Sequence, residues 1–146
     1  MLKPLPLRQV SIFYLKQIII LGSLAFGMWI FESWMRTEAL WQGDWQALWI
    51  LTVSFVAIQL IIITTPLLML FKRLKRLPLF YTAGLISGPI GVALFIWIFT
   101  YQPFDWYGYL IWPQSEHIIG ASLGLGFAHN LRRFLLSIQI SAYTVK

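Results

Sequence analysis

The feature that most constrains the fold is a short basic segment near the middle of the chain, Lys72-Arg73-Leu74-Lys75-Arg76. It separates two long runs without any charged residue, 45–71 and 77–104. About 20 consecutive apolar residues are enough to cross the hydrocarbon core of a bilayer as a helix. Each run therefore predicts a transmembrane helix, and the basic segment predicts the loop that joins them.

The composition of the 146-residue chain agrees with lipid as its solvent. Hydrophobic residues make up 59% of the chain and charged residues 11%, whereas a soluble domain has about 25% charged residues. A globular domain of this length has too little interior to bury so much apolar surface. With an apolar run near each end, we expect one all-α integral membrane domain over residues 1–146. Its four transmembrane helices are expected at 11–34, 45–71, 79–101 and 113–131.

The charges separate into two groups along the chain. Of the 11 cations, all except Arg36 lie in the N-terminal, central and C-terminal segments. The acids lie in the other two loops and are Glu32, Glu38, Asp44, Asp105 and Glu116. Cytoplasmic loops of membrane proteins retain Lys and Arg. We therefore expect two helical hairpins joined by a basic cytoplasmic loop, with both termini cytoplasmic, in the bacterial inner membrane.

The basic start followed by an apolar run also fits a secretory signal peptide, with cleavage near Ser23-Leu24-Ala25. Too few apolar residues precede that site to form the hydrophobic region of such a peptide. A retained first helix is the favoured interpretation.

Small residues recur at helical spacing in the last two predicted helices. The expected packing glycines are Gly84, Gly88 and Gly91 on one face of the third helix, and Gly120 and Gly124 on the fourth. A second small pair, Ser122 and Gly126, follows on the fourth helix, whereas Gly22 lies outside these stripes. Small residues let helix backbones approach closely in lipid. The glycines therefore predict helix packing, either within one subunit or between subunits.

Polar groups inside the predicted spans form a second set of candidate residues: Gln59, Thr64, Thr65 and Ser122. A buried amide or hydroxyl needs a hydrogen-bond partner, so these groups predict either contacts between helices or the lining of a polar pathway. The sequence Thr64-Thr65-Pro66 also predicts a bend in the second helix, because Pro66 has no backbone donor.

No pattern in the sequence is typical of an enzyme or a metal site. Cysteine is absent, and the two histidines, His117 and His129, lie at opposite ends of the fourth predicted helix. We expect no catalysis, cofactor, metal or nucleic acid. The clustered cations are expected to set orientation and to contact lipid headgroups; they are Lys72, Arg73, Lys75, Arg76, Arg132 and Arg133.

The segment from Ser137 to Ala142 alternates polar and apolar residues. This period is typical of a strand, although a continuation of the fourth helix is the alternative. An unpaired strand is a template for pairing with another chain. We therefore expect 137–144 to dock on a partner through Ile138 and Ile140.

Two classes of function fit these features. The first is an interaction protein that associates with itself or with a membrane or cytoplasmic partner, such as an accessory subunit, a toxin-immunity protein or a phage-defence component. The alternative is a small homo-oligomeric channel or transporter, in which the polar groups of the spans would line the pathway.

Overall fold

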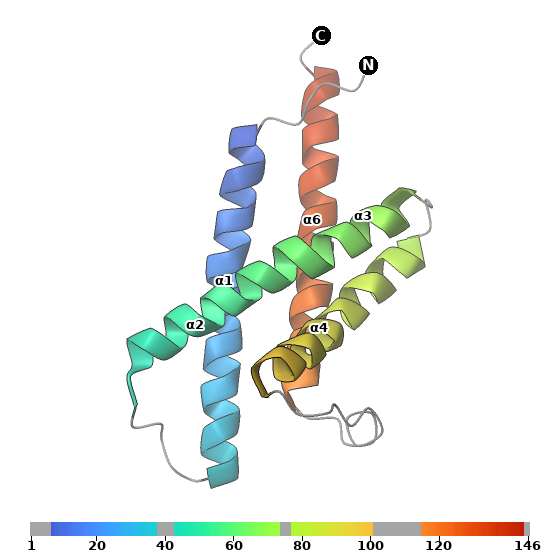
Figure 1. Cartoon of the computed structure of the whole chain (residues 1–146). Helices are drawn as coiled ribbons and strands as arrows, with labels where there is room; N and C mark the ends of the chain where they lie inside the picture. The colour runs from blue at the N-terminus through green and yellow to red at the C-terminus, as the bar shows by residue number, and fades with distance from the viewer. Residues whose placement is uncertain (1–6, 38–42, 74–76, 101–114, 145–146) are drawn as a thin grey trace.

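A computed structural model describes residues 7–37, 43–73, 77–100 and 115–144, and nearly all of these residues are helical. They form four rods (Figure 1). The first is α1 (Leu7–Thr37). The second consists of α2 (Trp45–Ile58), the π-helical turn η1 (Gln59–Thr64) and α3 (Thr65–Arg73). The others are α4 (Leu77–Thr100) and α6 (Ser115–Thr144). The prediction of an all-α chain with four helices is confirmed for this part of the chain.

Three of these rods contain segments long and apolar enough to cross a membrane, namely Leu7–Phe31, Trp45–Lys72 and Leu77–Leu94. The rod α6 is not among them, although the sequence predicts a span over 113–131. The reason is its polar content, since His117, His129 and Asn130 interrupt the apolar run before Arg132.

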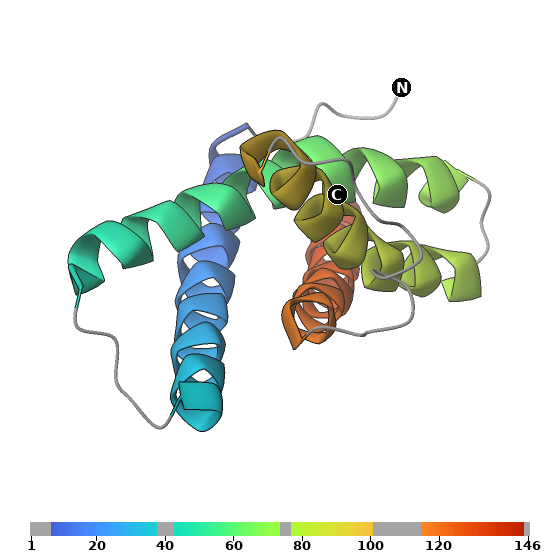
Figure 2. The ribbon, with the colours of Figure 1, turned by 60° about the horizontal axis from the view of Figure 1, so that its bottom comes forward.

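The rods pack in a closed ring of neighbours. Helices α1 and α6 lie side by side and antiparallel, so that α1 begins and α6 ends at the same end of the molecule (Figure 1). The second rod crosses them obliquely, and α4 returns along its η1 and α3 segments (Figures 1 and 2). Helix α2 packs on α1, and the most extensive contact joins α4 to α6.

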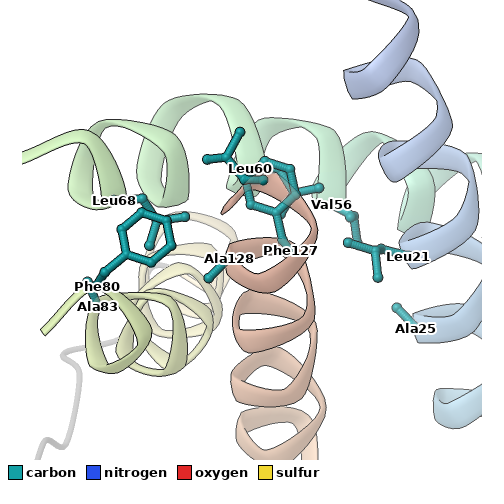
Figure 3. Packing of buried hydrophobic residues seen from close by; sticks show 10 residues of the cluster. Leu21, Ala25, Val56, Leu60, Leu68, Phe80, Ala83, Phe127 and Ala128 are labelled. Carbon is teal, nitrogen blue, oxygen red and sulfur yellow. The ribbon is translucent and has the colours of Figure 1, made fainter. Parts of the chain in front are cut away.

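The core draws side chains from all four rods (Figure 3). Phe127 of α6 is fully buried near Leu60 of η1, while Leu68 of α3 faces Phe80 of α4. Large apolar side chains also cover the outside; Ile62 is 65% exposed and Phe31 62% exposed. A soluble monomer rarely presents a contiguous apolar surface of this kind.

The π-helical turn η1 has a local cause in Pro66. A proline ring collides with the carbonyl four residues earlier in an α-helix. Here the turn widens, so that the Thr65 N–H bonds to the Leu60 carbonyl five residues back. The Thr65 hydroxyl also donates to that carbonyl, at 2.6 Å. The sequence predicts a bend near this proline, and the structure has a π-helical turn directly before it.

The start of α2 has a conventional cap. The Asp44 carboxylate accepts hydrogen bonds from the backbone N–H groups of Gln46, at 2.9 Å, and Ala47, at 3.1 Å. Such a cap satisfies donors that have no partner within the helix. The helix therefore begins at Trp45, where the uncharged run begins.

The C-terminal segment is helical, so the strand interpretation of residues 137–142 is wrong. Helix α6 continues to Thr144. Leu131, Phe134, Leu135 and Ile138 recur at helical spacing; the first three pack in or against the core, and Ile138 is half-buried. Phe134 stacks on Phe13 of α1, with ring centroids 4.3 Å apart. These contacts stabilise the helix beyond the point where the predicted span ends.

Candidate functional site

The glycines of α4 and α6 lie at a close contact between the two helix backbones. A Cβ atom on Gly88 would overlap the backbone carbonyl of Gly120, and one on Gly124 would overlap the carbonyl of Gly84. A Cβ on Gly84 would lie 2.7 Å from the Cβ of Ala128. Because the obstacles are mostly backbone atoms, they cannot turn aside as a side chain can. Four of the predicted packing glycines therefore meet within one subunit.

Gly22 forms a second close contact, between α1 and α2. A Cβ there would lie 2.9 Å from Val53 Cγ2 and 3.0 Å from Val53 Cα. At the next residue of α1, the Ser23 hydroxyl accepts a hydrogen bond from Trp49 Nε1 at 3.1 Å. Gly22 therefore belongs to a packing surface, contrary to its position outside the glycine stripes in the sequence. Gly27, by contrast, has open space where its Cβ would be.

The predicted polar residues Gln59 and Thr64 meet around Ser87 of α4. Gln59 Nε2 donates to the Ser87 carbonyl, and the Thr64 hydroxyl donates to Ser87 Oγ at 3.0 Å. Ser87 Oγ in turn donates to the Gly84 carbonyl at 2.8 Å. All three side chains are buried. This cluster joins η1 to α4 at the level of the glycine contact.

The last predicted packing glycine, Gly91, lies against the amide of Gln59. A Cβ on Gly91 would overlap Gln59 Oε1, so the absence of a side chain creates the space for that amide. Gln59 Oε1 is buried and has no hydrogen-bond partner among the described residues. Gly91 therefore contacts the second rod rather than α6.

Two further polar contacts join α1 to its neighbours. The Tyr14 hydroxyl and Thr65 Oγ1 are 2.7 Å apart, and Asn130 Nδ2 of α6 donates to Gln17 Oε1 at 2.9 Å. Sequence reasoning found Thr65 but missed Tyr14, Gln17 and Ser87. Their signal was weak, because each is a single polar residue beside an apolar run and its partner lies far away in sequence.

The second small pair of α6 faces outward. Ser122 is exposed, and a Cβ on Gly126 would have no atom within 4 Å. The Ser122 hydroxyl donates to the Ile118 carbonyl of its own helix at 2.8 Å, which satisfies it without a partner helix. Ile118 and Leu125 are exposed on the same helix. Helix α6 thus uses one small pair against α4, and no other described residue covers the second pair.

The predicted headgroup cations whose side chains are described lie at the end of α3 and in the second half of α6. Lys72, Arg132 and Arg133 are all exposed. Arg132 Nη1 donates to the Tyr81 hydroxyl at 3.3 Å, and the Tyr81 ring stacks on His129. Of the other predicted headgroup contacts, Arg73 is the last residue of α3, and its side chain is not among those described. Lys75 and Arg76 lie outside the described residues.

The segment expected to dock a partner is a helix rather than a strand. Positions two apart in a helix are not on the same face of the backbone, so the alternation in this segment no longer defines a face. Ile138 is half-buried, and the side chain of Ile140 lies outside those described. Docking of this segment as an added strand therefore loses its structural basis.

Within the described residues, no three His, Cys, Asp or Glu side chains lie together so as to hold a metal ion. No protein-family model matches this chain, and neither does any curated protein or solved structure. Together the site residues join the helices of the chain to one another. The glycines allow the helix backbones to approach closely, and the amides and hydroxyls form hydrogen bonds between helices.

Proposed function

We propose that the chain is a small protein of the bacterial inner membrane that acts by associating with other helices, as an accessory, toxin-immunity or phage-defence subunit. Four spans with cytoplasmic termini are part of this proposal. The three long apolar helices support it, as does the position of nearly all cations in three segments of the chain. In this arrangement α6 is the fourth span, with its polar residues shielded in part by α1 and α4.

The observation that carries the associative function is the Ser122–Gly126 pair of α6, which no other described residue covers. Small residues four apart promote contact between helices in lipid, because they let the backbones approach closely. The adjacent pair, Gly120 and Gly124, makes such a contact with α4 inside the subunit. The outward pair offers similar small residues, and its hydroxyl is already satisfied. A second helix, from another copy or from a partner subunit, is the occupant that suits it.

The expected topology is tested with single cysteines, which is straightforward because the chain has none of its own. In intact spheroplasts, Asp105→Cys should react with a membrane-impermeant maleimide. Lys75→Cys should react only after the membrane is opened, because the basic loop is expected in the cytoplasm. Labelling of both positions in intact spheroplasts would contradict the four-span arrangement.

The associative function is tested with Gly126→Leu. We expect this change to weaken the assembly by at least about tenfold, because the leucine would hold the partner backbone away. The measurement is the mass of the complex extracted in a mild detergent, by light scattering across a dilution series.

Gly27→Leu on α1 is the matched control, since both glycines have open space at Cβ. It should leave the assembly unchanged. A wild-type protein that is monomeric in gentle extracts, or an assembly equally tolerant of both changes, would refute the proposal.

A small homo-oligomeric channel or transporter is the second candidate. The observation in its favour is the π-helical turn η1, with Gln59 and Thr64 buried on it, because π-helical turns occur frequently at functional sites. Ion conductance of the purified protein in planar bilayers, abolished by Gln59→Leu, would favour this candidate over a purely associative role.

A further inference from the structure

A pocket of about 220 Å³ lies where the end of α3 and the start of α4 meet the C-terminal half of α6. Its apolar lining includes Phe71, Phe80, Leu135 and Leu136. Its polar lining consists of Lys72, Arg132 and Gln139. The pocket therefore combines a hydrocarbon-like wall with two cations that come from different rods.

The two cations of this pocket are available to an anion. Lys72 and Arg132 are both exposed, and no carboxylate is among the described residues that line the pocket. One guanidinium nitrogen of Arg132, Nη1, donates a hydrogen bond to the Tyr81 hydroxyl at 3.3 Å. A guanidinium carries five N–H donors, so this contact positions the group while leaving donors free.

We propose that this pocket binds one anionic phospholipid of the cytoplasmic leaflet. Its phosphate lies between Lys72 and Arg132, and part of an acyl chain lies against Phe71, Phe80 and Leu135. The chemistry fits an amphiphile, because the cations and the apolar wall belong to the same pocket. This inference rests on the proposed placement in the membrane, where the pocket lies at the end of the long apolar rods.

The size of the pocket means that it would hold only part of a lipid. Pockets that enclose a whole drug-sized molecule occupy about 300–1,000 Å³, whereas this one is smaller. It suits the headgroup region of a molecule whose remaining hydrocarbon lies in the bilayer. A lipid bound there would contact α3, α4 and α6 together and so link the basic hairpin to the end of α6.

The test uses the full chain in a mild detergent, titrated with phosphatidylglycerol or phosphatidylcholine of identical acyl chains, with bound lipid counted by native mass spectrometry. Phosphatidylglycerol should bind at least about tenfold more tightly. Changing both Lys72→Gln and Arg132→Gln should weaken its binding by about thirtyfold, since each cation near the lipid surface contributes about fivefold. Inorganic phosphate should not displace the lipid.

Arg8→Gln is the matched control, because Arg8 is an exposed arginine of α1 and is not among the residues that line the pocket. It should change binding by less than about twofold, and helicity measured by circular dichroism should be equal in all variants. Three results would each overturn the inference: equal binding of the two lipids, equal losses for Arg132→Gln and Arg8→Gln, or competition by inorganic phosphate.

The labelling experiment separates this inference from the proposed function. A protein that fails to insert would refute the membrane proposal itself. A correctly inserted protein without preference for phosphatidylglycerol would refute only the lipid site.

Discussion

Gly88→Leu is expected to lower the free energy of unfolding by about 3 kcal/mol, the upper end of the range for overpacking a close contact. A Cβ at this position would overlap the Gly120 carbonyl. Because that obstacle is backbone, α4 and α6 would have to separate. Thermal unfolding in detergent, followed by loss of the monodisperse species in size exclusion, measures the effect.

Gly27→Leu serves as the control for this prediction as well. Its Cβ meets no atom within 4 Å, and leucine in a helix is intrinsically favoured over glycine by up to about 1 kcal/mol. The control should therefore be at least as stable as the natural protein. If the two variants unfold at the same temperature, the close approach of α4 to α6 does not exist.

A second large effect is expected at the contact between Gly91 and Gln59. Gly91→Ala should destabilise the protein by about 1–3 kcal/mol, because the added methyl occupies the space of the Gln59 amide. Displacing that amide also breaks its bond to the Ser87 carbonyl and leaves a buried donor without a partner. Unfolding of the Gly91→Ala variant in detergent measures the steric cost and the lost hydrogen bond together.

The diagnostic measurement for this contact is a double-mutant cycle. Gln59→Ala removes the obstructing amide, so Gly91→Ala should cost little in that background. The expected coupling energy is about 1–3 kcal/mol, within the range seen for residues in direct contact. Identical costs of Gly91→Ala in both backgrounds would show that the two residues do not touch.

The C-terminal helix illustrates how the choice of a sequence window decides a prediction. Residues 137–142 alternate like a strand when read alone. A window that begins at Leu131 has the helical spacing 131, 134, 135 and 138, and the structure buries these positions wholly or in part. The stacking of Phe134 on Phe13 of α1 supports the helix, and that contact joins opposite ends of the sequence.

The glycines show a different limit. Their spacing predicted close packing but left open whether it occurs within or between subunits. The structure places Gly84, Gly88, Gly120 and Gly124 in one internal contact, and it gives Gly22 a similar contact with Val53. Gly22 does not belong to a series of small residues at helical spacing, because a single glycine is sufficient where one helix crosses another obliquely.

The sequence by itself determined the helical rods. Long runs without charge can satisfy their backbone groups in an apolar surrounding only by forming helices, and the basic and acidic segments mark where the runs end. Only the tertiary structure decided which polar groups pair and which small residues remain uncovered. Partners such as Asn130 and Gln17, or Tyr14 and Thr65, lie far apart in the chain. Their pairing depends on where the rods cross, and no local pattern of residues encodes that angle.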